Sequence, residues 1–173
     1  MSDSPLPIRL TQAVGLTTSL LLGGGNCAIS VLFVPRLLES PAPLLLQQWN
    51  NLYQVGMRTF PPLAIVASVS YFYLARDAGF GESWKATAYA ISGALTVGII
   101  PYTLLFMKKI NGKLATKLEE IRNLGKPESV VEEEESVGEE SAHQLLDLWG
   151  LLNLMRGLML STAGVLGVWT VLN

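Results

Sequence analysis

The chain has 173 residues and a formal net charge of −2 at pH 7, with half of its residues hydrophobic and 15% charged. A typical soluble domain has about 25% charged residues, so this composition argues against an ordinary soluble domain and against a nucleic-acid partner. The chain has one cysteine, Cys27, and one histidine, His143. An intrachain disulfide is therefore impossible, and we expect no all-protein metal site.

Four apolar segments follow one another along the chain, each long enough to cross a bilayer as a helix. A bilayer core needs about 20 helical residues, and the spans fall at approximately residues 10–34, 44–75, 84–107 and 142–172. The second span carries polar side chains in its first half and is expected to bend at Pro61-Pro62, while Pro101 predicts a kink near the exit of the third. The sequence predicts an all-α protein, a single transmembrane domain over residues 1–173, folded as an antiparallel four-helix membrane bundle.

One long hydrophilic stretch, residues 108–141, separates the third and fourth spans. Its first part, "KKINGKLATKLEEIRNLGK", is expected to continue the third helix out of the membrane as an amphipathic extension. Residues 128–141 then carry seven glutamates and no basic residue, a composition typical of a disordered loop.

The distribution of lysine and arginine near the span ends predicts the orientation in the membrane. One side has seven basic residues and the opposite side has three: Arg36, Lys108, Lys109, Lys113, Lys117, Arg122 and Lys126 against Arg9, Arg76 and Lys85. We therefore expect a multi-pass protein with both termini on the lumenal or outer face. In a eukaryotic host, the endoplasmic reticulum or another endomembrane is the expected location.

Polar and small residues recur every three or four positions in the first span, which includes the run "GGGN". Polar groups inside a bilayer are costly, so they normally face the bundle interior, where they either hold helices together or line a site. Close helix packing explains the glycines most simply. For Asn26, an interhelical hydrogen bond and a contact to a ligand are equally good explanations.

The second and third spans add aromatic side chains to this interior pattern. Trp49 and Tyr53 share a helix face with a glycine and a phenylalanine; they are either interfacial anchors or part of a site wall. Tyr102 follows Pro101 directly. Asn111 lies just beyond the third span and is expected to be solvated.

The last span carries Trp149, Asn153 and Arg156 at i, i+4 and i+7, so that one helix face holds all three. Arg156 is the only charged residue after Asp147 and lies near the middle of the span. It is either held by carbonyls or a packing partner, or directed into a polar cavity that holds an anion; we favour the cavity. His143 and Asp147, four residues apart, could pair at its mouth, although a lone histidine at a helix start more often has a capping or surface role.

Three stretches resemble a family of small four-helix membrane proteins that includes the fungal anthrone oxygenases. They are "WNNLYQVGMRTFPP" in the second span, "PYTLLFMKKINGKL" at the exit of the third and "LLDLWGLLNLMRGLM" in the fourth. The resemblance covers nearly the whole chain except the acidic run.

This resemblance implies an oxygenase that needs no cofactor, in which a hydrophobic aromatic polyketide-like anthrone is itself the electron source for O2. Arg156 and Asn153 would stabilise the oxyanion, and His143 would be the base. The remaining candidates would bind substrate, with the aromatic side chains stacking on its rings: Trp149, Trp49, Tyr53, Asn26 and Tyr102.

Two other functions fit the same polar stripes. The first is a non-enzymatic binder or transporter of lipids or small molecules, and the second is a structural subunit in which Arg156 pairs with a partner helix. A cavity that ends blindly at Arg156 would favour the oxygenase over a permeation path. The sequence does not assign an oligomeric state.

Overall fold

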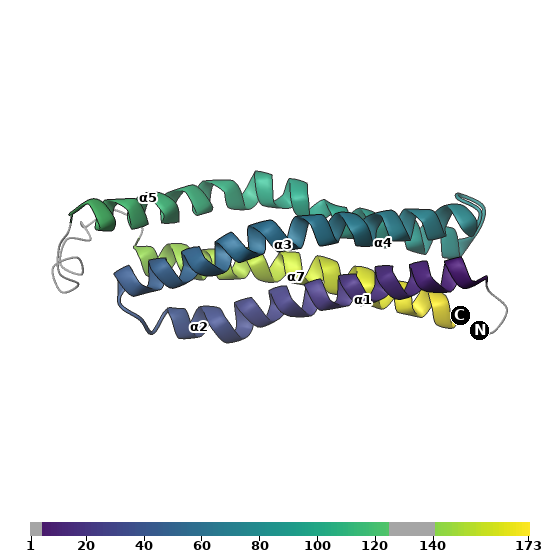
Figure 1. The fold of residues 1–173 in the computed structure, drawn as a ribbon, viewed down its shortest axis with the longest axis horizontal. Helices are drawn as coiled ribbons and strands as arrows, with labels where there is room; N and C mark the ends of the chain where they lie inside the picture. Colours follow the sequence, from purple (N-terminus) through teal and green to yellow (C-terminus); the bar gives the residue numbers. More distant parts are fainter. Residues whose placement is uncertain (1–4, 125–140) are drawn as a thin grey trace.

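The computed structural model describes residues 5–124 and 141–173, which form a bundle of four long antiparallel helical segments (Figure 1). The first segment comprises α1 (Leu6–Ala28), a π-helical stretch η1 (Ile29–Phe33) and α2 (Val34–Leu37). The second is α3 (Ala42–Asp77). The third joins α4 (Trp84–Tyr102), a π-helical stretch η2 (Thr103–Met107) and α5 (Lys108–Leu124), and the fourth is α7 (Ala142–Leu172). The start of α1 and the end of α7 lie at the same end of the bundle.

This architecture confirms the predicted all-α four-helix fold and the helical extension of the third segment. The helix α3 runs without interruption through Pro61 and Pro62, and the irregularity of the third segment is a π-helical turn that begins two residues after Pro101. Residues 125–140 lie outside the described residues, and so does the prediction for the acidic run.

Local sequence signals set the ends of several helices. The hydroxyl of Ser83 accepts a hydrogen bond from the backbone N–H of Ala86 at 3.1 Å and caps α4, as its position predicts. In the turn before it, Gly79 and Gly81 adopt φ angles of +81° and +84°, a conformation that glycine adopts without steric cost. Ser141 and Gln144 form a reciprocal capping box that begins α7.

The middle of the bundle carries its apolar side chains on the outside. Exposed residues there include Leu21, Val69 and Val165, which are 62–70% exposed, whereas buried positions hold small and polar side chains such as Ser19 and Thr96. Among the described residues, three helical segments are long and apolar enough to cross a membrane: Leu6–Leu37, Trp84–Asn123 and Ala142–Leu172. The helix α3 has the length but a more polar first half.

The end of the bundle formed by α2, α5 and the first turns of α3 and α7 has the opposite pattern. A core of large apolar side chains fills its interior, among them Leu46, Leu114 and Leu146, each fully buried. Its exposed positions include Gln47, Lys109 and others that are polar. A polar exterior over an apolar core is the arrangement of a helix bundle in water.

Candidate active site

A cavity of about 230 Å³ lies where these two parts of the bundle meet. Ligand pockets commonly measure about 300–1,000 Å³, so this one suits a compact molecule. Its walls come from α3, α7 and the third segment, with Ile29 contributed by η1. The lining residues are Ile29, Leu52, Tyr53, Gly56, Met57, Phe60, Pro61, Ile99, Ile100, Thr103, Leu104, Met107, Asn111, Trp149, Asn153 and Arg156. They form an apolar and aromatic chamber with a few polar groups, one of which is a guanidinium.

Arg156 is held by a clamp that a neighbouring helix provides. The side-chain oxygen of Asn26, on α1, accepts hydrogen bonds from Arg156 Nε at 3.1 Å and from Nη2 at 2.8 Å. Asn153, one turn earlier on α7, accepts a further bond from Nη2 at 2.8 Å. Since arginine only donates, both amides must present their oxygens to it, which fixes the orientation of each.

The side-chain N–H groups of Asn26 and Asn153 donate to other protein groups. Asn26 Nδ2 donates to the carbonyl of Leu22 at 2.9 Å, and Asn153 Nδ2 donates to the carbonyl of Asn26 at 3.0 Å and to the Ser30 hydroxyl at 2.9 Å. Asn153 therefore uses both of its N–H groups within the protein and has none left for a ligand, whereas Asn26 uses one of its two in this bond. The oxygen of Asn153 bonds Arg156, and a direct role of Asn153 at an oxyanion stays a prediction.

The charge of Arg156 is not neutralised by the groups that hold it. Its polar contacts among the described residues are two amide oxygens and the Thr103 hydroxyl, which lies 3.4 Å from Nη1, and the Phe60 ring lies 5.8 Å from Cζ. Nη1 carries two N–H groups and makes only this one long contact. A cation directed into an apolar chamber with a donor to spare is suited to binding an anion.

Small residues allow α1 and α7 to approach closely enough for this clamp. A Cβ added to Gly157 would lie 2.9 Å from the backbone nitrogen of Cys27, and one added to Gly23 would lie 2.7 Å from that of Ser161. The neighbouring Gly24 has no such contact within 4 Å. Close packing therefore explains Gly23 in the "GGGN" run, and it places Asn26 against Arg156.

Aromatic side chains form a large part of the cavity wall. Tyr53 lines it, and Trp49 lies behind Tyr53 with the two rings stacked at 5.2 Å. Trp49 is fully buried, and its Nε1 has no hydrogen-bond partner. Trp149 meets Trp49 edge to face and donates from Nε1 to the side-chain oxygen of Asn111 at 3.0 Å.

Beyond Arg156 the bundle is closed by a packed apolar layer. Leu22, Ile99 and Leu160 are at most 5% exposed there, and Ala64 completes the cluster with no exposure. Further along α1, the hydroxyl of Ser19 lies 2.7 Å from that of Tyr71. The cavity therefore ends blindly, which disfavours a permeation path.

The eight candidate residues from the sequence divide into three groups. Arg156, Asn153, Trp149 and Tyr53 line the cavity. Asn26 and Trp49 stand directly behind lining residues and support them.

The other two candidates lie outside the cavity. Tyr102 donates to the carbonyl of Leu152 at 3.3 Å and packs on Phe106. The ring nitrogen Nε2 of His143 lies 3.1 Å from the carbonyl oxygen of Ser40, at the polar end of the bundle. The structure thus ties His143 to the α2–α3 turn, and Asp147 is exposed to solvent.

Sequence reasoning missed Asn111, which is 8% exposed and not solvated as expected. The signal was its spacing, since Thr103, Met107 and Asn111 follow at i, i+4 and i+8 and all line the cavity. The lysines that surround Asn111 in the sequence led to the expectation that it is solvated. Phe60 was visible on the face of Tyr53, but its contact with Arg156 depends on how two distant segments pack.

The fold and the cavity define a class of protein: a small helical bundle with three helices apolar enough to cross a membrane, enclosing a blind aromatic chamber with one cation. The family model described as anthrone oxygenase matches residues 49–166, and the chain belongs to this family. This confirms the predicted resemblance and the prediction of an oxygenase-like enzyme.

Curated relatives match over most of their length. The chain is 31% identical over 159 residues to an anthrone oxygenase of Paecilomyces divaricatus, covering 90% of this chain and 92% of the relative. It is 30% identical over 174 residues to one of Aspergillus fumigatus, covering 94% and 93%. A noranthrone monooxygenase of Aspergillus flavus is 29% identical over 162 residues, covering 91% and 71%. No solved structure matches the chain significantly.

Proposed function

We propose that this protein is a membrane-embedded oxygenase that converts an anthrone to a quinone with O2 and without a bound cofactor. The family membership and the names of the relatives support the reaction class. The apolar exterior of the bundle's middle supports the embedding. The observation that carries the site assignment is Arg156, a cation held only by neutral groups at the blind end of an apolar aromatic cavity.

The reaction balances without an external reductant. The central methylene of the anthrone loses a proton, and the resulting enolate gives its electrons to O2 as a carbon–oxygen bond forms. The peroxide then loses its O–O bond and the second methylene hydrogen as water, leaving the new carbonyl. One oxygen atom enters the product and the other leaves as water, and the oxidation of the methylene to a carbonyl supplies all four electrons that reduce O2.

Arg156 acts on the first of these steps. As the methylene is deprotonated, negative charge moves to the existing carbonyl oxygen of the substrate, and Nη1 of Arg156 is the donor free to receive it. Stabilising the enolate raises the acidity of the methylene. Asn26 and Asn153 hold the guanidinium in place and are positioning residues.

Asn111 provides a second polar contact for the substrate. Its oxygen is bound by Trp149 Nε1, a group that only donates, so its Nδ2 must point the other way. Trp149 and Arg156 are seven residues apart on one helix face, or about 10 Å along the axis. The cavity therefore suits a flat molecule with an enolisable carbonyl at one end and a further oxygen at the other.

The proposed proton acceptor is a water molecule and not a side chain of the cavity. No histidine, aspartate or glutamate is present among the described lining residues, and His143 is bound elsewhere. We propose that the methylene, acidified by Arg156, loses its proton to water. The rim residues Met57 and Leu104, 47% and 61% exposed, would admit an apolar substrate from the bilayer.

Turnover by purified variants tests this proposal. The protein in detergent is supplied with an anthrone and O2, and quinone absorbance is followed above the spontaneous background. Arg156→Ala should lower the rate by about 10²- to 10³-fold, the loss typical of removing one oxyanion donor. Arg58→Ala, which removes an exposed arginine of α3, is the matched control. Wild-type protein without activity above background would refute the function, and an active Arg156→Ala variant would refute the site.

A further inference from the structure

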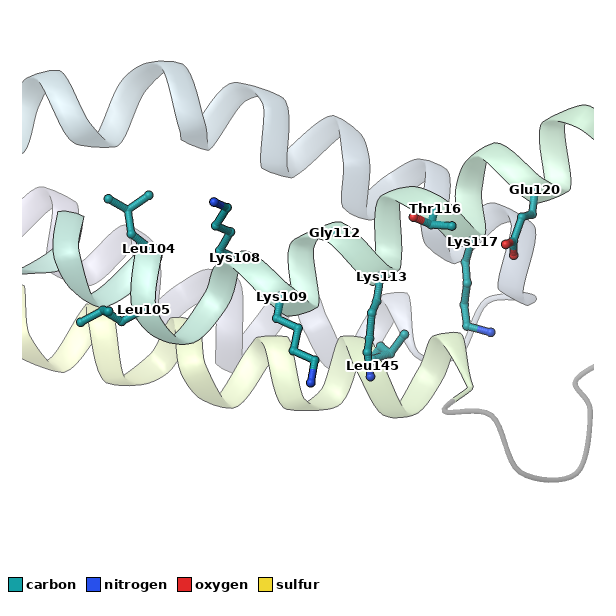
Figure 2. A pocket seen from close by; sticks show the side chains of 10 residues that line it. All are labelled: Leu104, Leu105, Lys108, Lys109, Gly112, Lys113, Thr116, Lys117, Glu120 and Leu145. Atoms are coloured by element: carbon teal, nitrogen blue, oxygen red, sulfur yellow. The ribbon is translucent and has the colours of Figure 1, made fainter.

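A second, basic groove runs along the outer face of α5, outside the cavity described above. Its volume is about 960 Å³. Figure 2 shows Lys109 and Lys113 extending from α5 across the ribbon of α7, with Lys117 one turn further along. These lysines follow at i, i+4 and i+8 and so share one face of the helix. The remaining polar lining is Lys108, the hydroxyl of Thr116 and the carboxylate of Glu120, so four lysines line the groove with one carboxylate.

One end of the groove is apolar, and there is empty space next to the helix backbone in its middle. Leu104 and Leu105 line that end and are 61% and 76% exposed. At Gly112, in the middle of the groove, an added Cβ would meet no atom within 4 Å. The groove therefore joins an exposed apolar surface to a row of cations, which is the pattern of an amphiphilic anion.

The helical segment that carries the groove places it at a membrane surface, if the proposed spanning arrangement holds. Trp84, 51% exposed at the start of α4, is suited to one interface. The 21 residue-to-residue steps from Trp84 to Leu105 rise about 32 Å, close to the roughly 30 Å of a bilayer core. Lys108 and Lys109 would then emerge among the headgroups, with Lys113 and Lys117 just beyond.

We propose that this lysine groove binds the phosphate of an anionic phospholipid, whose acyl chains lie along Leu104 and Leu105. Clusters of basic residues directly after a membrane span attract anionic lipids, by about 1 kcal/mol for each lysine near the surface. Among the described lining residues, the groove and the cavity have only Leu104 in common. The proposal rests on the membrane embedding and is independent of the oxygenase reaction.

Lipid binding to the purified full chain in detergent tests this inference. Dioleoyl phosphatidylglycerol and dioleoyl phosphatidylcholine are titrated separately, and bound lipid is counted by native mass spectrometry. The triple variant K109Q/K113Q/K117Q removes three groove charges. The matched control, R9Q/R76Q/K85Q, removes the same number of charges at the opposite end of the chain's predicted spans.

The expected result is a preference for phosphatidylglycerol that weakens about tenfold or more in the groove variant, at about fivefold for each lysine as an upper value. The control variant and the lysine-to-arginine triple variant should keep it. Equal binding of the two lipids, or an equal loss in the control, would overturn the proposal. So would displacement of the lipid by millimolar inorganic phosphate, which would indicate a site for free anions. A preference seen only after the seven glutamates of residues 128–140 are replaced by glutamine would assign the groove to that segment instead.

The outcome can be separated from that of the proposed function. The lipid measurement involves no anthrone, so its failure leaves the reaction untested and unaltered. Conversely, a protein inactive on anthrones can still show the lipid preference. A chain that stays monodisperse in water without detergent would refute the embedding, on which the lipid groove depends.

Discussion

Replacing Asn26 by aspartate asks whether the positive charge of Arg156 drives the proposed reaction. Asparagine and aspartate have the same shape, so the oxygen that accepts from Nε and Nη2 of Arg156 stays in place. The substitution also replaces the donor to the carbonyl of Leu22 by a carboxylate oxygen, which that carbonyl repels, and the new ion pair with Arg156 opposes this repulsion. The guanidinium remains, but a carboxylate now balances its charge.

The distances in the clamp set the size of the effect. A substrate oxyanion at Nη1 would lie about 7 Å from the new carboxylate, on the far side of the guanidinium, given ordinary hydrogen-bond lengths. At an effective dielectric constant of about 20, like charges about 7 Å apart repel by roughly 2.4 kcal/mol. Enolate formation should therefore slow about fiftyfold, since roughly 1.36 kcal/mol is a factor of ten in rate.

The assay is quinone formation from an anthrone in air-saturated detergent solution, with the melting temperature of each variant measured alongside. Asn50→Asp makes the same chemical change on α3, at a partly buried position outside the cavity lining, and should keep the wild-type rate. Wild-type turnover by Asn26→Asp, with an unchanged melting temperature, would show that the reaction does not depend on the net charge at Arg156.

Three further predictions concern the surroundings of the site. His143→Ala should keep quinone formation within about twofold of wild type, because the ring bonds a turn carbonyl away from the cavity; a hundredfold loss would restore it as the base. Trp149→Phe should raise KM severalfold, because it releases the Asn111 amide that Trp149 Nε1 holds. Trp49→Phe removes an Nε1 without a hydrogen-bond partner among the described residues and should leave KM unchanged. Equal effects of the two variants would contradict the proposal that Asn111 contacts the substrate at the end of the cavity away from Arg156. Gly157→Ala should lower the melting temperature by forcing α1 and α7 apart, whereas Gly24→Ala, at an open helical position, should raise stability by up to about 1 kcal/mol; the reverse order would refute the close approach.

Hydrophobic length and periodicity were sufficient to predict most of the fold. Each segment longer than a bilayer is thick had to be a helix, because the backbone can satisfy its own hydrogen bonds only in that form. The same periodicity put Trp149, Asn153 and Arg156 on one face of α7, and the structure confirms that all three line one cavity.

Which side chains of the site contact one another could not be predicted from length and periodicity. Asn26 and Arg156 are 130 residues apart, and nothing in either helix alone states that an amide of one clamps the guanidinium of the other. The sequence around Asn111, which is rich in lysine, predicts a surface residue, whereas in the fold Asn111 accepts a hydrogen bond from Trp149. His143 has the chemistry of a base, but its place in the fold gives it a different partner.

The sequence by itself determined that four helices form, which residues share a face of each, and that an arginine in the last span needs polar partners. These are consequences of local geometry and of the cost of unsatisfied groups in an apolar medium. Only the tertiary structure decided which face meets which, because that depends on where glycines such as Gly157 let two backbones approach. Because α1 and α7 approach closely, Arg156 is held by neutral groups at the end of a cavity.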